Sequence, residues 1–245
     1  MNLLEVQGLR KTYPAFRLKD VSLSVPEGAV MGLIGRNGAG KSTTLKSILG
    51  LVHPDAGRVE MFGREFSENE RYIKENIGVV LGGIDFYPKK KVRTITDVTR
   101  RFYSNWQEEK YRHYLDLFAI DENKRVDQLS SGMRVKYLLA LALSHNARLL
   151  ILDEPTSGLD PVSRDELTEL LRHIAADGTR SVLFSTHITS DLEKCASHIT
   201  FIQEGRLQRS DTLAGFMAHY ADLGSTLEEI IVAAERRPYD ADAII

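Results

Sequence analysis

Residues 29–51 read AVMGLIGRNGAGKSTTLKSILGL, a short apolar run followed by a glycine-rich turn and a segment with helical spacing. The run from Ala29 to Ile34 is short and stops at a glycine, which predicts a buried strand. The segment from Lys41 to Leu51 repeats its apolar residues at helical intervals and predicts a helix. A strand that leads into a helix through a glycine-rich loop is typical of an α/β fold.

The turn between them matches the phosphate-binding pattern G-x-x-x-x-G-K-[ST]. Its glycines let backbone N–H groups point inward at phosphate oxygens, and the helix that follows adds the positive end of its dipole. Lys41 is expected to reach the β- and γ-phosphates of a nucleotide, and Ser42 to ligate Mg²⁺. The predicted nucleotide-binding residues are Gly35, Arg36, Asn37, Gly38, Ala39, Gly40, Lys41, Ser42 and Thr43.

A second apolar run, Leu149 to Leu152, ends in two adjacent carboxylates, Asp153 and Glu154. An apolar strand that ends in acids is common, but downstream of a phosphate-binding loop it indicates nucleotide hydrolysis. Asp153 is then expected to hold Mg²⁺ through its water shell, and Glu154 to orient and polarise the attacking water.

The other elements extend the same alternating pattern. Short apolar runs predict strands at 77–81, 181–185 and 199–202, and helical patterns fill most of 86–145. Ser130 and Ser131 are expected to cap a helix that runs to about His145, and Asp160-Pro161 to open another that ends before Gly178. Strands that alternate with helices predict an α/β fold with a mostly parallel sheet. From Asp211 onward we expect helix, and from Pro238 a loose tail.

Further motifs, in a fixed order, make the chain resemble the ATP-binding subunits of ABC transporters. Leu129-Ser-Ser-Gly-Met133 is similar to the family's signature, usually L-S-G-G-Q, and Ser157-Gly-Leu-Asp160 to its D-loop. His187, in Ser-Thr-His, matches the switch histidine, and Tyr13 the aromatic residue that stacks on adenine. The resemblance covers the chain from Tyr13 to about Arg206.

The resemblance implies a P-loop NTPase fold with an antiparallel N-terminal β region and a helical subdomain. It implies ATP and Mg²⁺ as cofactors, Lys41, Glu154 and His187 as catalytic residues, and Ser42 and Asp153 as metal ligands. The other implied nucleotide contacts are Tyr13, Asp153, Ser130, Ser131, Gly132 and Asp160. It divides the chain into an ATPase domain at 1–220, with its helical subdomain at about 86–145, and a C-terminal helical extension and tail at 221–245.

The implied partners are a second ATPase subunit, whose signature would face this chain's phosphate-binding loop, and a separate transmembrane permease. The Gly-Met ending of the signature and the Leu227-Glu-Glu-Ile segment resemble bacterial ABC-2-type exporters of drugs or peptides. The protein would then work peripherally at the cytoplasmic face of a bacterial membrane.

Two segments depart from the family pattern. The signature has Ser131 and Met133 where glycine and glutamine are usual, and the loop after Leu81 reads Gly82-Gly83-Ile84-Asp85, without the family's glutamine. That loop usually contributes a metal or water contact and coupling to the permease. Asp85 is either a substitute for the glutamine or a solvated carboxylate.

A basic run, 89–91, is followed by Arg93. It predicts either a solvated loop or a surface that touches the permease or anionic lipid headgroups.

The composition bears on the protein's partners and on the compartment in which it works. Lys plus Arg is 32 and Asp plus Glu is 34, a balance that gives no electrostatic footprint for nucleic acid. The single cysteine, Cys195, suits a reducing compartment, and the N-terminus does not resemble a signal peptide. No apolar run approaches the length that crosses a bilayer.

The alternative function is a soluble ABC ATPase without a permease, such as one for cluster assembly. A regulatory module that holds ATP without turnover is disfavoured by Lys41, Asp153, Glu154 and His187.

Overall fold

A six-stranded sheet forms the centre of the computed structural model, which describes residues 1–81 and 87–236. Its strand order is β10-β9-β3-β8-β7-β6, and every neighbouring pair except β9–β10 is parallel. The strands are β3 (Val30–Ile34), β6 (Ile77–Leu81), β7 (Leu149–Asp153), β8 (Ser181–Thr186), β9 (His198–Gln203) and β10 (Arg206–Thr212). All residues of β3, β7 and β8 are buried, as expected for parallel strands with both faces covered.

A second sheet is antiparallel, with the order β2-β1-β4-β5. Its strands are β1 (Asn2–Tyr13), β2 (Phe16–Pro26), β4 (Ala56–Met61) and β5 (Arg64–Glu65). Together the two sheets confirm the predicted fold class, with a mostly parallel core and an antiparallel N-terminal region.

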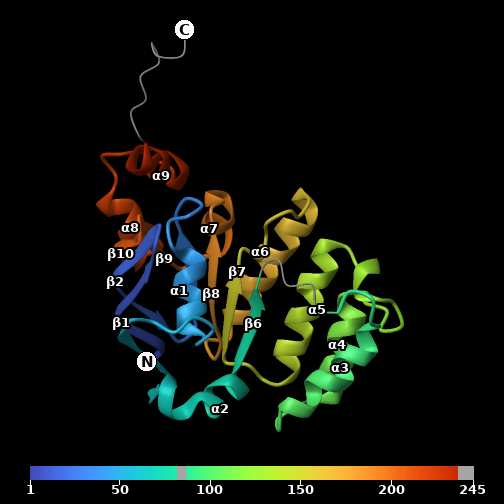
Figure 1. Ribbon diagram of the computed structural model, residues 1–245. Helices are drawn as coiled ribbons and strands as arrows, with labels where there is room; N and C mark the ends of the chain where they lie inside the picture. The colour runs from blue at the N-terminus through green and yellow to red at the C-terminus, as the bar shows by residue number, and fades with distance from the viewer. Residues whose placement is uncertain (82–86, 237–245) are drawn as a thin grey trace.

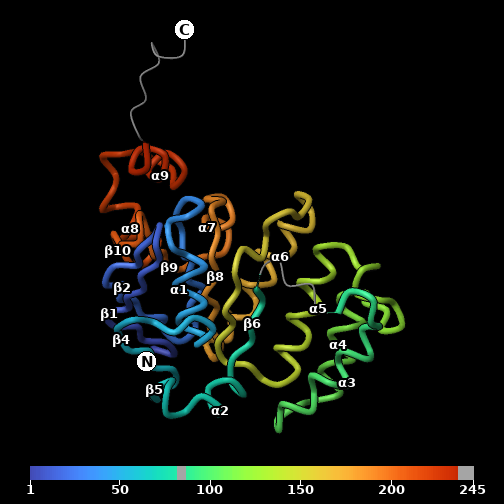
Figure 2. The backbone as a smooth tube through the Cα atoms, in the orientation of Figure 1, coloured from blue at the N-terminus to red at the C-terminus, as the bar shows by residue number. Residues whose placement is uncertain are grey.

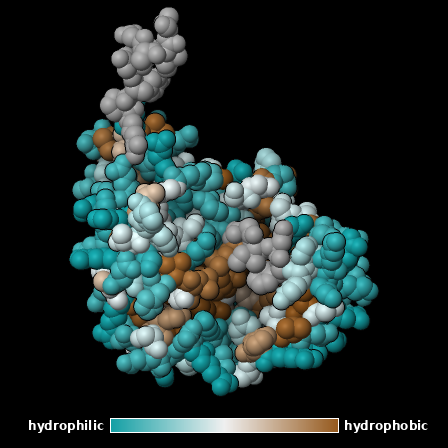
Figure 3. All heavy atoms as spheres, viewed as in Figure 1, coloured by the Kyte–Doolittle hydropathy of each residue, from teal (hydrophilic) through white to brown (hydrophobic). Residues whose placement is uncertain are grey.

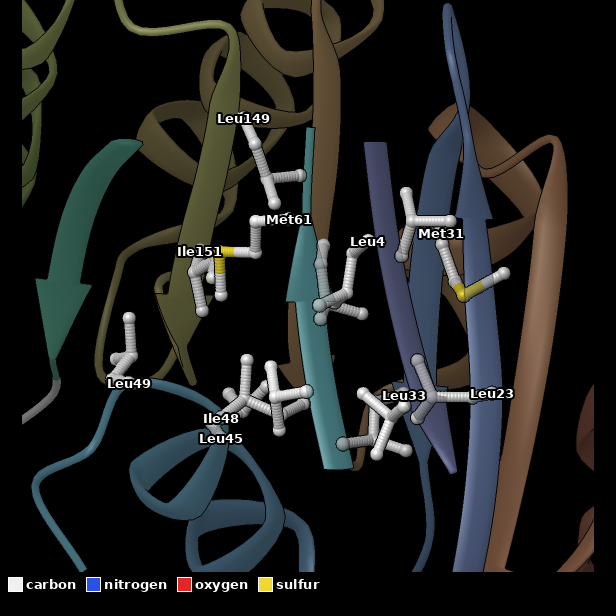
Figure 4. Packing of buried hydrophobic residues seen from close by; sticks show 14 of the residues in the cluster. Leu4, Leu23, Met31, Leu33, Leu45, Ile48, Leu49, Met61, Leu149 and Ile151 are labelled. Carbon is white, nitrogen blue, oxygen red and sulfur yellow. The ribbon is translucent and has the colours of Figure 1, made fainter. Parts of the chain in front are cut away.

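One of two equally large hydrophobic clusters among the described residues lies between these sheets and helix α1 (Lys41–Ile48). Figure 4 shows Leu45 and Ile48 of α1 beside apolar side chains from strands of both sheets, among them Leu4, Met61 and Ile151. Helix α1 begins directly after the phosphate-binding loop, so this packing anchors one side of the loop in the core.

The helices α3 (Val92–Thr99), α4 (Glu108–Leu117) and α5 (Ser131–Ser144) stand beside the sheets as a separate group, seen at the right of Figures 1 and 2. They have a hydrophobic cluster of their own, which includes the fully or nearly fully buried Val92, Tyr111 and Tyr137. The Thr96 hydroxyl is hydrogen-bonded to both tyrosine hydroxyls, at 2.7 and 2.9 Å. The helical elements between β5 and β9 are α2 (Phe66–Asn76), α3 (Val92–Thr99), η1 (Arg100–Phe102), α4 (Glu108–Leu117), η2 (Val126–Gln128), α5 (Ser131–Ser144), α6 (Pro161–Ala175) and α7 (Thr189–Cys195).

The prediction of helix from Asp211 onward is wrong for its first two residues. Asp211 and Thr212 end β10, which pairs with β9 through a hairpin whose turn contains Gly205 at φ +74°. Thr212 then caps helix α8 (Leu213–His219) by accepting a hydrogen bond from the N–H of Gly215. A last helix, α9 (Leu227–Glu235), follows.

Several predictions concern residues outside the described ranges. These are the Gly82-Gly83-Ile84-Asp85 loop and the tail from Pro238 to Ile245. Within residues 1–81 and 87–236, none of the helices is both long enough and apolar enough to span a membrane.

Candidate functional site

The phosphate-binding loop leaves the end of β3 and turns sharply into α1. Gly40, the residue before α1, has φ +116°, which favours glycine. At Gly35 space is the constraint, because a Cβ there would lie 2.2 Å from the carbonyl oxygen of Ile202. The glycines at these two positions therefore allow the backbone geometry and the close packing on which the loop depends.

Lys41 is enclosed by the loop, and its residue is only 5% exposed. Its ammonium group donates hydrogen bonds to the carbonyl oxygens of Gly35 at 2.7 Å and Arg36 at 3.3 Å. It also forms an ion pair with Glu154, at 3.2 Å from Oε1. A buried ammonium needs such oxygen partners, and phosphate oxygens offer the same kind of contact.

Glu154 directly follows β7, and its backbone has φ +49°, an uncommon conformation for a residue with a side chain. Its carboxylate pairs with Lys41 through one oxygen and lies 2.9 Å from Nδ1 of His187 through the other. His187 comes immediately after β8. The three residues predicted to be catalytic therefore meet where the adjacent parallel strands β7 and β8 end.

Asp153 and Ser42, the predicted metal ligands, also lie together. The Ser42 hydroxyl donates to Asp153 Oδ1 at 3.1 Å, and the buried Ser185 hydroxyl donates to the same oxygen at 2.6 Å. Ser185 Oγ also accepts the N–H of Glu154 at 2.9 Å. One carboxylate and one hydroxyl beside a phosphate-binding loop fit Mg²⁺, which is usually held by few protein groups together with phosphates and water.

Ser185 is a site residue that sequence analysis missed. It belongs to the same Ser-Thr-His segment as His187, so the signal was present, but its role depends on the register between strands. In the parallel pair β7–β8 it lies directly opposite Asp153.

A cleft of about 620 Å³ opens over these groups. It brings together the predicted residues Tyr13, Asn37, Gly38, Gly40, Lys41, Ser42, Thr43, Glu154 and His187. Ala15, Phe16 and Ser157 also line it and were not among the predicted site residues. Tyr13 is 37% exposed, and the Lys11 ammonium lies over its ring, 5.8 Å from the centroid.

The signature residues do not line this cleft. Ser130 caps α5 by accepting the N–H of Met133 at 3.2 Å, as predicted. The Ser131 hydroxyl donates to the carbonyl oxygen of Gly158 at 3.4 Å, so the signature rests on the D-loop of its own chain. A Cβ on Gly132 would lie 3.2 Å from Ser163, which shows how closely the two segments pack.

Asp160 also lies outside the lining of this cleft, where it caps helix α6. It accepts hydrogen bonds from the N–H groups of Val162 and Ser163, both at 3.1 Å, and from the Ser163 hydroxyl at 2.6 Å. These bonds, that from the Ser163 hydroxyl first, hold the pKa of Asp160 below its ordinary value.

The basic run at 89–91 is exposed and lies beside the segment that precedes the signature. Backbone hydrogen bonds join Asp127 to Pro88 at 2.9 Å and Val126 to Lys90 at 3.1 Å. Arg93 is occupied by an ion pair with Glu122.

Comparison with known proteins decides the family. The family model described as ABC transporter matches residues 18–157. This chain belongs to the ABC transporter family. It binds and hydrolyses ATP, so the predicted family and enzyme class are confirmed.

Curated relatives of this ABC chain include ATP-binding proteins from several bacteria. The bacitracin transport ATP-binding protein BcrA of Bacillus licheniformis is 32% identical over 208 residues, which cover 84% of this chain and 68% of the relative. The ABC transporter ATP-binding protein YtrB of Bacillus subtilis is 31% identical, with 84% and 70% covered. The Nod factor export ATP-binding protein I of Burkholderia thailandensis is 36% identical, with 83% and 68% covered.

Solved structures agree on the fold. An ATP-binding subunit of an ABC transporter superposes with a TM-score of 0.84 at 27% identity, covering 96% of this chain and all of that one. A dimeric ATP-binding cassette in a post-hydrolysis state with ADP and Pi superposes with a TM-score of 0.75 at 22% identity, covering 86% of this chain and 98% of that one.

Proposed function

We propose that this chain is the energy-coupling subunit of a bacterial exporter, working peripherally at the cytoplasmic face of the membrane through a separate permease. The observation that carries the proposal is its 32% identity, over most of its length, to a bacitracin transport ATP-binding protein. The likeness to a Nod factor export protein supports the same direction of transport. A drug or an amphipathic peptide is the proposed class of substrate.

The proposed catalytic roles follow from the contacts at the ends of β7 and β8. Glu154 orients and polarises the attacking water, and His187, 2.9 Å from its carboxylate, fixes the orientation of that carboxylate. Lys41 moves from the loop carbonyls and Glu154 to the phosphates, which frees the carboxylate for water. Ser42 and Asp153 would hold Mg²⁺, which neutralises phosphate charge during such a transfer.

The active form is proposed to be a head-to-tail dimer. The residues 130–132 lie at the start of α5, outside the cleft that contains Lys41, and Ser130 and Ser131 are exposed. The N-terminus of this 14-residue helix can therefore meet a phosphate that another subunit holds. Asp160 and the D-loop under the signature would reach the same interface.

A groove between β6 and the helices α3 and α5 supports docking of a permease segment. It has a volume of about 240 Å³ and is lined mainly by apolar side chains, among them Val79, Leu81 and Leu138. Figure 3 shows hydrophobic surface gathered in the middle of the same face. At one end of the groove His145 stacks on Tyr103, with ring centroids 3.7 Å apart.

The experiment pairs this chain with a candidate permease from a neighbouring reading frame, in proteoliposomes and in a bacitracin-sensitive bacterium. We expect the permease to raise ATP hydrolysis, and the pair to raise resistance to a drug or an amphipathic peptide. The same pair with E154Q should confer no resistance. A permease that leaves both ATP hydrolysis and resistance unchanged would favour the soluble ATPase instead.

Dimerisation is tested with E154Q alone, by light scattering with ATP and Mg²⁺. We expect a dimer, because slowed turnover preserves the ATP that bridges two subunits. A monomer at saturating ATP, with and without the permease, would refute the head-to-tail arrangement.

A further inference from the structure

The C-terminal helix α9 reaches two elements of the nucleotide site at once. Figures 1 and 2 place it at the end of the molecule where α7 lies and where the chain turns into α1. At its beginning, the N–H of Leu227 donates to Glu193 Oε1 of α7 at 3.0 Å. Helix α7 begins two residues after His187, so Glu193 belongs to the element that directly follows the switch histidine.

At its other end α9 contacts the phosphate-binding loop through Glu235. The Glu235 carboxylate accepts the backbone N–H of Arg36 at 3.1 Å and lies 3.4 Å from the Arg36 guanidinium. The guanidinium also donates to the backbone carbonyl of Glu235 at 3.5 Å. Gln203, at the end of β9, donates to the carbonyl oxygen of Ala234 at 3.1 Å and fixes this last turn.

The stability of helix α9 does not explain why a glutamate occupies position 235. A carboxylate in the last turn faces the negative end of the helix dipole, which disfavours it. The residue is also only 7% exposed, and a buried carboxylate is costly without hydrogen-bond donors. The contacts to Arg36 supply such donors, and one of them is a backbone N–H of the phosphate-binding loop.

Helix α9 is itself firmly anchored. Leu227 and Ile230 are completely buried in the core cluster that also contains Leu192 of α7. Thr226 and Glu229 form a capping box at its start. The phosphate-binding loop, by contrast, contains Gly35, Gly38 and Gly40, and glycine-rich backbone loses more entropy when it is ordered.

We propose that α9 acts as a strut between α7 and the phosphate-binding loop, and that Glu235 is a positioning residue for ATP binding. Glu235 holds the backbone of Arg36, the residue that follows Gly35, before the nucleotide arrives. Less of the loop then has to be ordered by the phosphates. Because the opposite end of α9 is bonded to α7, the loop and the element that follows His187 keep a fixed relative position. The inference rests on the assignment of this loop to phosphates.

The test measures ATP affinity by calorimetry, and kcat and KM for hydrolysis, in the full chain. We expect E235A to weaken ATP binding about fivefold, the equivalent of one ordinary hydrogen bond, while kcat changes less than twofold. E235Q keeps an oxygen that can accept the Arg36 N–H and should recover most of the affinity. The matched control is E228A, an exposed glutamate on the same helix, which should bind ATP as the unmodified chain does.

The strut is tested at its other end with E193A, which removes the acceptor for Leu227. We expect weaker ATP binding here too, although Glu193 lies outside the lining of the nucleotide cleft. Wild-type affinity in a folded E235A chain would overturn the role of Glu235, and wild-type affinity in E193A would overturn the strut. An equal loss of affinity in E228A and E235A would also refute the proposal, because it would mark general damage to α9. If K41A bound ATP normally, the assignment of the loop itself would fail instead.

Discussion

Ser185 offers a direct test of how the site is held together, because its hydroxyl connects Asp153, the last residue of β7, with Glu154, which follows it. It donates to Asp153 Oδ1 at 2.6 Å and accepts the N–H of Glu154 at 2.9 Å. The substitution Ser185→Ala removes both bonds and leaves the strand otherwise unchanged. Each former partner keeps another contact: Asp153 still accepts from Ser42, and the Glu154 N–H is still 3.2 Å from the Ser185 carbonyl.

The expected losses of stability and of ATPase activity in this variant follow from these contacts. Loss of a buried hydrogen bond to a charged group costs about 1.5–3 kcal/mol of unfolding free energy, and the surviving partners favour a value near 2 kcal/mol. For a chain of this size that corresponds to a melting temperature lowered by about 4–8 °C. ATPase activity, measured where the variant is still folded, should fall by about tenfold to a hundredfold, because Asp153 loses the donor that orients it.

The matched control is Ser181→Ala, at the other end of the same strand. Ser181 is also completely buried, and its hydroxyl donates to the carbonyl oxygen of Pro26 at 2.8 Å, away from the nucleotide cleft. This variant should lose about 1 kcal/mol of stability and keep its ATPase activity. The assays are thermal unfolding without nucleotide, and ATP hydrolysis over a range of Mg²⁺ concentrations well below the unfolding temperature.

The reasoning is refuted if S185A and S181A hydrolyse ATP equally fast when both are folded. It is also refuted if S185A retains both its melting temperature and its Mg²⁺ dependence, since the hydroxyl would then do nothing for Asp153.

Three further outcomes are expected. Glu154→Gln should bind ATP with near-normal affinity but lose at least about a hundredfold in kcat, measured by single-turnover hydrolysis; a rate equal to that of the unmodified chain would contradict its role. Gly32→Ala places a Cβ 1.9 Å from Leu192 in the core and should lower the unfolding free energy by about 1–3 kcal/mol in urea titration, whereas an unchanged midpoint would show that the core yields there. Burial lowers the pKa of His145 to about 4. Its unfolded pKa is higher, near 6.5, so about 3 kcal/mol of stability that is present above pH 6.5 is lost as the pH falls toward 4. His145→Phe keeps the stack on Tyr103 and should make stability depend less on pH between 6.5 and 4. An unchanged pH dependence would mean that a different group titrates.

Much of the site could be predicted from local pattern alone. The loop from Gly35 to Ser42 has its chemistry within eight consecutive positions, and the caps formed by Ser130 and Asp160 depend on neighbours a few residues away. The wrong assignment of Asp211 has the opposite cause. Its strand conformation comes from pairing with β9, which overrides the local pattern.

The amino-acid sequence by itself determined the phosphate-binding loop, the buried strands of the parallel sheet and the family, because each depends on residue types at short, fixed spacings. The tertiary structure decided which distant residues meet. Ser185 faces Asp153 only because β7 and β8 pair in parallel register, and Glu235 reaches Arg36 only because α9 packs beside α7, at the end of the molecule where the phosphate-binding loop lies (Figure 1). Such contacts join residues tens or hundreds of positions apart, and spacing along the chain carries no information about them until the strands and helices are packed.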